Sequence, residues 1–597
     1  MKPALVLGLV ALCLGGIIAA TSSTGSPVTA IRNVRVFDGK TILSNATVLF
    51  SNGVITGVGP AVKIPAAATV IDGTGKTLLP GLIDAHAHVL PGSLERALRF
   101  GVTTELDMFT QVGLARQMRA EQRAGVTNRA DMLSAGTLVT VEHGHGTEYF
   151  KIPVYTPGSD PQAFIDARIA EGSDYIKFIY DNGSAYGLTL NTLTKSDLKA
   201  LIDAAHKRGK MTLVHVATLE AARDAIAAGA DGLAHVFNDV APDPDFGRFV
   251  AAHHAFVVPT LSVNESAAGV PTGVSLVSDA RLQPYLNAAE IESLKASFPS
   301  RPGSSHNIDN AGAAVRQLKA AGVPMLAGTD APNPGTAHGV SIHRELDLLV
   351  KAGLTPAEAL AAATSTPARL FHLNDRGRVA KGLRADLLLV NGDPTTDIQA
   401  TRDIVTVFKG GVPLARERET NEAQAAVETV PPDRLAAGMI SNFESGKPDT
   451  EIGSSWQIST DSIMGGSSTA TMDVVDGGAN GSSKSLHVHT DTKPGSMFPW
   501  AGPMVFLGSS QMRPVDLSSR PGFSFFAKGN VDIRLMLFSV SGGRIPRLAT
   551  AHAGADWTEI TMRWSDFSSD GKDIQAILFA GPDASAVDFQ IDELHLK

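Results

Sequence analysis

The sequence has almost no cysteine. Cys13 is the only one among 597 residues, and it lies in an N-terminal segment that we expect to be removed. A disulfide framework is therefore excluded, and hydrophobic cores must stabilise the fold. An excess of basic residues is also missing, since 51 Lys and Arg face 60 Asp and Glu for a net charge of −9. Without a basic stripe or an arginine cluster, we expect no nucleic-acid partner.

The N-terminus, MKPALVLGLVALCLGGIIAATSSTG, differs in character from the rest of the chain. Lys2 precedes a glycine-broken apolar run that is followed by small polar residues, which is typical of a secretory signal peptide. We assign residues 1–20 to it and expect a periplasmic or secreted protein. An uncleaved anchor is the weaker alternative, because a membrane span normally needs about 20 apolar residues. Leu12 before Cys13 does not suit a lipoprotein acceptor.

The length predicts several domains, because one hydrophobic core rarely serves more than about 300 residues. Residues 28–80 contain short β-patterned runs with Asp-Gly and Asn-Gly turns, typical of hairpins. Residues 376–415 return to this pattern, so the two stretches are predicted to form one discontinuous small β-sandwich. Residues 416–437 read as a polar linker. Residues 438–597 contain period-2 runs such as VDIRLMLFSV and predict a second β-sandwich.

Between these β-regions, residues 81–375 alternate apolar strands with alanine-rich amphipathic helices that end at glycine. Eight strands with intervening helices predict an α/β fold of the (β/α)8 TIM-barrel type. A doubly wound open sheet is the alternative, but no GxGxxG turn follows a strand here. The predicted strands are GLIDAHAHV, VTTELDMF, DMLSAGTLVT, YIKFIYD, MTLVHVA, GLAHVF, FVVPTLSV and PMLAGTD.

Six polar residues interrupt these apolar strands, each in the C-terminal part of its strand. A barrel gathers those ends at its active-site mouth. Taken singly, each has an ordinary explanation as a hydrogen-bonded core histidine, a capping aspartate or a lysine that reaches the rim. Burying all of them together without compensation would be costly, and divalent metal ions supply that compensation. The six are His86, His88, Lys177, His215, His235 and Asp330.

Lys177 is the unusual member, because a protonated ammonium cannot ligate a cation. It fits only if it is deprotonated or converted to an anion. At this point the sequence resembles the amidohydrolase superfamily, in PGLIDAHAHV, the strand-borne Lys177, His215, His235, GTDAPNPGTAHG and RADLLLVNGDP. The resemblance covers residues 28–415. It is greatest to the branch of imidazolonepropionase-like proteins and exported dipeptidases acting on Xaa-Pro or Xaa-Arg bonds.

The resemblance implies a binuclear centre, with zinc as the expected metal. Lys177 would be an N6-carboxylysine bridging two divalent ions, with His86, His88 and Asp330 on the first and His215 and His235 on the second. Two such ions about 3.5–4 Å apart lower the pKa of a shared water. Asp330 would then accept a proton and pass it to the leaving amine.

Candidate substrate contacts lie in loops after the strands. In VEHGHGTEYF, His145 matches a Gly-His-Gly element of similar proteins, while His143 is additional, and an incidental solvated loop is an equal alternative. Tyr180 and His338 are further candidates. Arg344 and Glu345 are expected on a solvated or ion-paired helix face.

The C-terminal region has its own resemblance, through FES, Trp456 and TDSIMGGSSTA, to the domain shared with complex I intermediate-associated protein 30. This implies a galactose-binding-like β-sandwich that contacts glycan, envelope or a second copy. Trp456, Trp500, Trp557 and Trp564 either form a sugar platform or pack in the core.

The combined hypothesis is an exported metal-dependent amidohydrolase that cleaves a peptide-like, N-acyl or cyclic amide. A homo-oligomer acting on a small-molecule amide or dipeptide is expected. Two alternatives stay open: a lactonase or esterase on the same metal site, and an envelope-binding or assembly protein that works through its C-terminal sandwich.

Overall fold

The computed structural model describes residues 28–147, 152–299, 301–419, 427–461, 467–493, 499–509, 513–542 and 546–597. The predicted signal peptide, with Cys13, lies outside the described residues, as do residues 420–426 of the predicted linker and 462–466 of TDSIMGGSSTA. Within the described ranges, no helix is long and apolar enough to cross a membrane.

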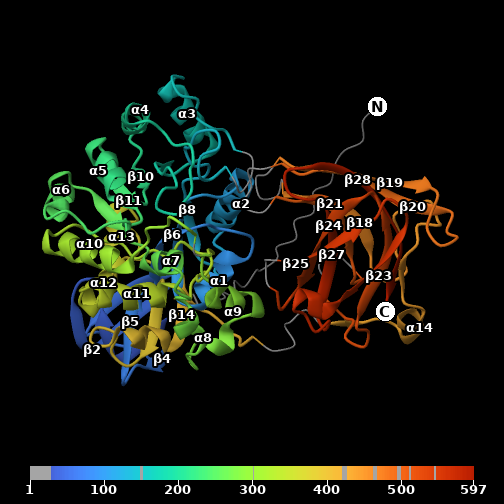
Figure 1. Cartoon of the computed structure of the whole chain (residues 1–597). Coiled ribbons are helices and arrows are strands. Elements are labelled where there is room, and N and C mark those ends of the chain that lie inside the picture. Colours follow the sequence, from blue (N-terminus) through green and yellow to red (C-terminus); the bar gives the residue numbers. More distant parts are fainter. Residues whose placement is uncertain are drawn as a thin grey trace, which may run out of the picture.

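An eight-stranded sheet combines strands from both ends of the first 415 residues. Its order is β15-β14-β13-β5-β1-β2-β3, with β4 paired to β1. β13 runs antiparallel to β5, placing Leu387 opposite Pro80. Figure 1 shows β2, β4 and β5, drawn in blue, beside the yellow β14. The strands are β1 (Thr29–Phe37), β2 (Ile42–Ser51), β3 (Val54–Gly59), β4 (Thr69–Asp72), β5 (Lys76–Pro80), β13 (Leu387–Asn391), β14 (Ile404–Lys409) and β15 (Val412–Pro413).

Eight parallel segments form a ring inside the α/β region. Two sheets, β6-β7-β8 and β9-β10-β11-β12, are joined by backbone bonds from Val139 N to the Lys177 carbonyl and from Ile179 N to the Val139 carbonyl. The eighth segment, residues 325–331, bridges β12 at Met325 and β6 at Ala331, which closes the ring. The strands are β6 (Leu82–Ala87), β7 (Val102–Asp107), β8 (Asp131–Ser134), β9 (Ile176–Ile179), β10 (Thr212–His215), β11 (Gly232–Ala234) and β12 (Phe256–Val258).

Amphipathic helices connect the strands. In α4, the Thr194 side chain accepts a hydrogen bond from Asp197 N, while Leu198, Leu201 and Ala205 are buried at the spacing of one helix face. The helices are α1 (Ser93–Arg99), α2 (Val112–Arg123), α3 (Pro161–Glu171), α4 (Lys195–Lys207), α5 (Leu219–Ala227), α6 (Phe246–Ala252), α7 (Leu261–Ala267), α8 (Val274–Val277), α9 (Ala288–Lys295), α10 (Ile308–Ala320), α11 (Ile342–Lys351), α12 (Pro356–Ala362) and α13 (Ser365–Leu370), with 3-10 turns η1 (Gln283–Tyr285) and η2 (Ile398–Arg402).

The C-terminal region is rich in β-structure and appears in orange and red in Figure 1. Its two sheets, β16-β22-β27-β21-β18 with β24 and β25, and β19-β20-β28-β23-β26 with β17, contribute to one hydrophobic core. Its elements are β16 (Glu428–Thr429), α14 (Pro432–Ala437), β17 (Met439–Ser441), β18 (Ser455–Thr460), β19 (Thr469–Asp476), β20 (Lys484–Asp491), β21 (Ala501–Phe506), β22 (Val515–Asp516), β23 (Gly522–Lys528), β24 (Val531–Ser539), β25 (Arg547–Ala553), β26 (Thr558–Arg563), η4 (Trp564–Phe567), β27 (Ile574–Ala580) and β28 (Ala586–Leu596).

Three of the four tryptophans are buried in this region. Trp456, Trp500 and Trp564 are 4%, 7% and 3% exposed, so core packing describes them and they form no exposed sugar platform. Trp557 is half-buried, with the Lys528 ammonium 4.6 Å from its ring centre.

A buried charge cluster joins the ring to the eight-stranded sheet. Asp131 begins β8, and its Oδ2 atom lies 2.9 Å from Lys409 Nζ at the end of β14. The same ammonium lies 2.9 Å from Asp386 Oδ2. Burial alone would raise the pKa of Asp131, but Lys409, Arg376 and Arg384 lower it below the ordinary value. Asp131 therefore remains charged and depends on these cations.

Lys409→Met should destabilise this part of the chain by about 3 kcal/mol, because removing one partner leaves buried carboxylates uncompensated. Denaturation followed by circular dichroism at the helix band reports on the α/β region. Tryptophan fluorescence, whose four fluorophores all lie between residues 456 and 564, reports on the C-terminal region.

The exposed pair Lys199–Asp203 provides the control. Lys199→Met should change stability by less than about 1 kcal/mol. Equal effects of Lys409→Met and Lys199→Met on stability would contradict this account of the cluster. So would a Lys409→Met variant whose tryptophan-fluorescence transition shifts as much as its circular-dichroism transition.

Candidate metal centre

The six residues singled out in the sequence lie together at one end of the ring. Contacts between neighbouring side chains connect all of them, directly or through a shared partner. His86 lies in β6 and His88 just beyond it, Lys177 lies in β9, His215 ends β10, His235 follows β11, and Asp330 lies in the eighth segment.

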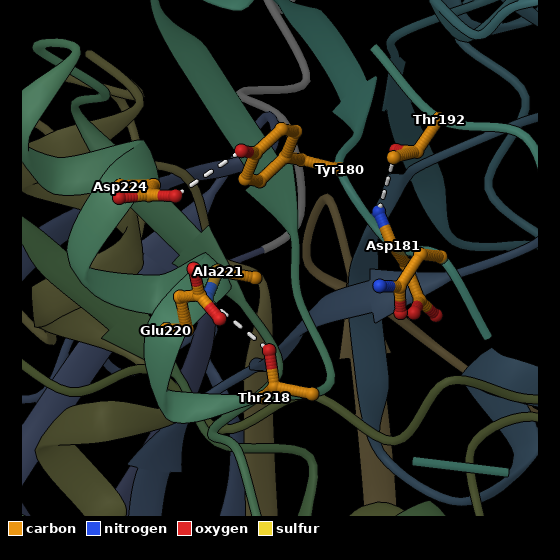
Figure 2. A pocket seen from close by; sticks show the side chains of 8 residues that line it. Tyr180, Asp181, Thr192, Thr218, Glu220, Ala221 and Asp224 are labelled. Atoms are coloured by element: carbon orange, nitrogen blue, oxygen red, sulfur yellow. Dashed lines mark hydrogen bonds between the residues drawn. The ribbon is translucent and has the colours of Figure 1, made fainter. Parts of the chain in front are cut away.

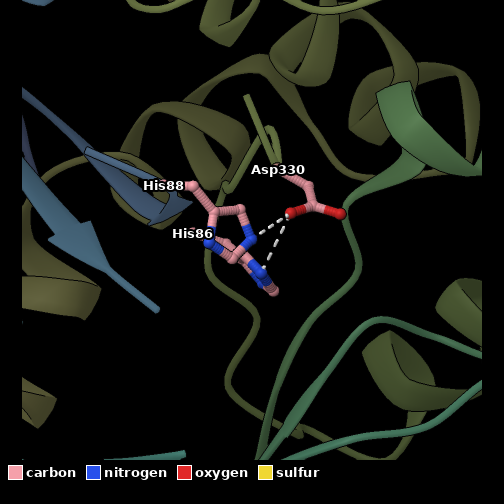
Figure 3. Close-up of side chains that lie close together, drawn as sticks. All are labelled: His86, His88 and Asp330. Carbon is pink, nitrogen blue, oxygen red and sulfur yellow. Dashed lines mark hydrogen bonds and ion pairs between the residues drawn. The ribbon is translucent and has the colours of Figure 1, made fainter. Parts of the chain in front are cut away.

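One carboxylate oxygen of Asp330 is shared by two imidazoles (Figure 3). Asp330 Oδ1 lies 3.2 Å from His86 Nε2 and 2.9 Å from His88 Nε2. One ligand atom from each residue can be chosen so that all three lie within 4.8 Å of one another. This donor set, two imidazole nitrogens and a carboxylate oxygen, is that of a zinc-type site.

The protonation of His88 strengthens this assignment. Its Nδ1 atom lies 3.2 Å from the Phe109 carbonyl, which can only accept, so Nδ1 carries the hydrogen. In the neutral imidazole, Nε2 then presents a lone pair to Asp330 Oδ1. Two acceptors at 2.9 Å require a proton or a metal cation between them. The residues present therefore fit a divalent ion.

Lys177 lies against the same cluster. Its side chain is 2% exposed, and Nζ is 3.5 Å from His86 Nε2. Burial lowers the pKa of Lys177 to about 7, against the opposing influence of Asp330 and Asp107. A substantial fraction of the amine is thus unprotonated near neutral pH, and it is the unprotonated amine that can react as a nucleophile.

The other two histidines form the opposite side of the cluster. The His235 ring centre lies 4.7 Å from that of His86 and 4.5 Å from that of His215. His235 Nε2 is 3.9 Å from Asp330 Oδ2. Burial lowers the pKa of His215 and lowers that of His235 well below the ordinary value, so both imidazoles are neutral. Neutral imidazole is the form that ligates metal.

Burial alone would raise the pKa of Asp330. His86 and His88, with His235, outweigh burial and hold this pKa well below its ordinary range. Asp330 is therefore a carboxylate.

Asp181 is a member of the site to which the sequence assigned no role. Its Oδ2 atom lies 3.2 Å from His215 Nε2, and its side chain is buried. Burial raises its pKa, but the bonds from His215 and from Gly183 N outweigh burial and lower it. The signal available in the sequence was its position four residues after Lys177, at the end of YIKFIYD.

The structure separates the two histidines of the strand-3 loop. The His145 ring centre lies 4.9 Å from that of His215, which places His145 at the cluster. The His143 side chain is 78% exposed, beside Glu142. Of the two imidazoles, His145 is the one positioned at the candidate site.

Tyr180 and His338 have protein partners. The Tyr180 hydroxyl donates to Asp224 Oδ2 at 3.1 Å, and Tyr180 lines a cavity of about 110 Å³ together with Asp181 and Thr218 (Figure 2). His338 is 7% exposed, and its Nδ1 atom lies 3.0 Å from Glu105 Oε1.

Glu345 departs from the solvated or ion-paired surface face expected for it. Arg344 is ion-paired with Glu265 and Asp347, but Glu345 is fully buried. Its carboxylate accepts hydrogen bonds from Leu261 N at 2.9 Å and from Ser262 N and Oγ at 2.8 Å. It therefore caps the N-terminus of α7, a role that pairs residues more than 80 positions apart.

The comparisons with known proteins agree with this geometry. The model of the Amidohydrolase family matches residues 77–414, more than half of the chain, so the chain belongs to this family of hydrolases acting on carbon–nitrogen bonds. The imidazolonepropionase of Cereibacter sphaeroides is 28% identical over 386 residues, which cover 60% of this chain and 91% of the relative.

Two solved structures share the fold. A Xaa-Pro dipeptidase with bound methionine aligns with a TM-score of 0.53 at 21% identity, over 65% of this chain and 99% of that one. A putative prolidase from Bifidobacterium longum aligns with a TM-score of 0.53 at 24% identity, over 67% and 97%. These likenesses support a TIM-barrel domain.

The buried carboxylate of Glu345 gives a pH test. Burial raises the pKa of Glu345 to about 7, so the folded state binds its proton more tightly than the unfolded state does. Its contribution to stability is present at low pH and is lost as pH rises through that value. Relative to Glu345→Gln, the wild type should lose roughly 3 kcal/mol between about pH 5 and about pH 8.

The measurement is chemical denaturation of metal-stripped protein across this range, with Glu292→Gln as the surface control. Glu292 lies in an exposed pair with Lys295, so its substitution should leave the pH curve parallel to that of the wild type. A Glu345→Gln curve that is also parallel would disprove the assignment.

Proposed function

We propose that this chain hydrolyses an amide bond of a small peptide-like, N-acyl or cyclic substrate at a binuclear metal centre. The observation that carries the proposal is the convergence of His86 Nε2 and His88 Nε2 on one carboxylate oxygen of Asp330. Two imidazole nitrogens and a carboxylate oxygen at these separations form a donor set that a divalent cation satisfies. Family membership and the neutral histidines on the other side of the cluster support the same conclusion.

In this proposal, His86, His88 and Asp330 would hold one divalent ion and His215 and His235 would hold the other. Lys177, converted to N6-carboxylysine, would help to hold both, which its burial against His86 favours. Zinc is the proposed metal, because imidazole and carboxylate suit it. When bound, the ions supply an activated water near neutral pH and polarise the substrate carbonyl.

The side chains themselves handle the protons. Asp330 is held as a carboxylate, and its Oδ2 atom is turned toward His235 rather than shared by His86 and His88. We assign to Oδ2 the acceptance of a proton from the attacking water and its delivery to the leaving amine nitrogen. Asp181 orients His215 through the 3.2 Å contact, so the ring presents its other nitrogen to the centre.

Substrate binding is assigned to the loops above the cluster. His145 lies closest to a proposed ligand, beside His215, and we propose that it contacts the substrate. Tyr180 and His338 are further candidates for substrate contact. Each would have to contact the substrate while keeping its present protein partner. The names of the similar proteins, imidazolonepropionase and Xaa-Pro dipeptidase, point to a cyclic amide or a dipeptide.

We also propose that the protein is exported, on the basis of the N-terminal 20 residues alone. A galactose-binding-like role for the C-terminal region, contact with glycan or envelope, and a homo-oligomeric state are proposals of the same kind. The two-sheet architecture of the C-terminal region is compatible with a galactose-binding-like role.

Metal content tests the binuclear centre. The purified protein should contain about two divalent ions per chain by elemental analysis, and Lys177→Ala should retain less than one, because it loses the bridging ligand. Lys210→Ala provides a control, since this lysine donates to backbone carbonyls away from the cluster. Protein that binds no metal and stays inactive after metal addition would refute the proposal.

Turnover tests the reaction and the proton acceptor. Among dipeptides, N-acyl amino acids, cyclic amides and lactones, an amide should be hydrolysed fastest. Asp330→Asn should lower kcat by at least about 100-fold, since it removes a positioned general base. Turnover of lactones alone would contradict the amide assignment, and an Asp330→Asn variant that loses no turnover while retaining its metal would contradict the role of Asp330.

A further inference from the structure

The hydroxyl of Thr260 is directed at the proposed ligand His235. Thr260 Oγ1 lies 2.6 Å from His235 Nδ1 and donates its only proton to the Pro259 carbonyl at 2.8 Å. Toward His235 it therefore presents a lone pair, so His235 Nδ1 must carry the hydrogen. The neutral ring then has its free lone pair on Nε2, the atom that faces Asp330.

Thr260 stands at the position where a threonine normally caps its own helix. It precedes α7, yet its side chain makes no capping hydrogen bond to that helix. The carboxylate of Glu345 takes over the capping by accepting from Leu261 N and Ser262 N. Because Glu345 caps α7 in place of Thr260, the Thr260 hydroxyl is available to His235.

The backbone at Thr260 is strained, and its surroundings hold it. Its φ of 49° and ψ of 49° lie in the left-handed region, which a β-branched residue rarely adopts. Glu345 fixes the two following residues. Asn264 fixes the preceding one, because its Nδ2 donates to the Pro259 carbonyl at 3.0 Å and to the Val236 carbonyl at 3.3 Å. The strain is thus retained at the point where it orients the hydroxyl.

We infer that Thr260 is a positioning residue that selects the Nδ1–H tautomer of His235 and so directs Nε2 to the second metal ion, while Glu345 frees it for this role. The inference rests on the proposed metal centre and adds to it the device that prepares one ligand before metal arrives. Partners of this kind typically change metal affinity by about 10- to 100-fold.

Thr260→Val is the direct test, because it preserves shape and removes the hydroxyl. Each protein is equilibrated with Zn²⁺ and a competing chelator, and bound zinc per chain is measured by elemental analysis. The affinity for one of the two ions should fall at least about 10-fold in Thr260→Val. Thr260→Ser restores the hydroxyl and should bind zinc within roughly threefold of the wild type.

Thr260→Gly separates positioning from folding. Glycine adopts positive φ without strain, so this variant relieves the backbone while removing the hydroxyl. A purely structural role predicts unchanged zinc affinity for it, whereas the positioning role predicts the same loss as in Thr260→Val. The comparison stays informative even where the valine variant folds poorly.

Thr401→Val is the matched control. Thr401 is another buried threonine, 3.0 Å from a histidine, His343 Nδ1, away from the cluster. Its substitution should lower the melting temperature and leave zinc affinity unchanged. Wild-type zinc affinity in both Thr260→Val and Thr260→Gly would overturn the inference alone. A wild type without bound zinc would overturn the proposed function and this inference together.

Discussion

The rest of the centre depends on one electrostatic constraint: two imidazoles and a carboxylate converge at one end of the ring. His88 Nε2 and Asp330 Oδ1 approach to 2.9 Å, while the other ring nitrogen of His88 faces the Phe109 carbonyl. Such an arrangement is unfavourable unless a cation lies between the two. These atoms belong to residues that follow β6 and the strand part of the eighth segment, the two segments that pair to close the ring. The ring must therefore close for the constraint to exist.

Around this constraint, the protein uses several buried carboxylates in different ways. Asp330 is stabilised as an anion by imidazoles, and Asp131 by a lysine and two arginines. Glu345 has no ion pair with a cation among the described residues and is satisfied by backbone and hydroxyl donors, and burial raises its pKa. The chemical role of each carboxylate follows from its partners rather than from its depth, because burial is the largest opposing influence on ionisation in all three cases.

The sequence was informative where chemistry conflicts with local pattern. A lysine inside IKFI, or two histidines in LIDAHAH, interrupt apolar strands and are visible without any structure. The resemblance to the amidohydrolase superfamily was confirmed. The common location of these residues at one end of the ring could also be expected, because the parallel strands of a barrel end at one face.

Contacts between distant residues could not be predicted in this way. Thr260 lies 25 positions from His235 and Glu345 lies 84 positions from Leu261, and neither residue breaks a local pattern. Thr260 looks like an ordinary cap, and Glu345 like a surface residue near the start of a helix. The sequence favoured His145 over His143 through the Gly-His-Gly element, but only the fold shows that His145 lies beside His215 and that His143 is exposed. The types of the site residues can be read from the sequence, but the tautomers of the histidines and the partners of each side chain require three-dimensional geometry.

The pairing of β5 with β13 also has a consequence for the synthesis of the chain. Pro80 in β5 pairs with Leu387 in β13, which is synthesised about 300 residues later. This edge of the sheet therefore stays unpaired until then. At a translation rate of roughly 5–20 residues per second, the interval is on the order of 15–60 s. During that time the first five strands present an open edge, which is a template for wrong pairing. The N-terminal hairpins therefore depend on delayed completion by a distant segment, and cellular factors that shield exposed strand edges would act on this chain before its catalytic part is complete.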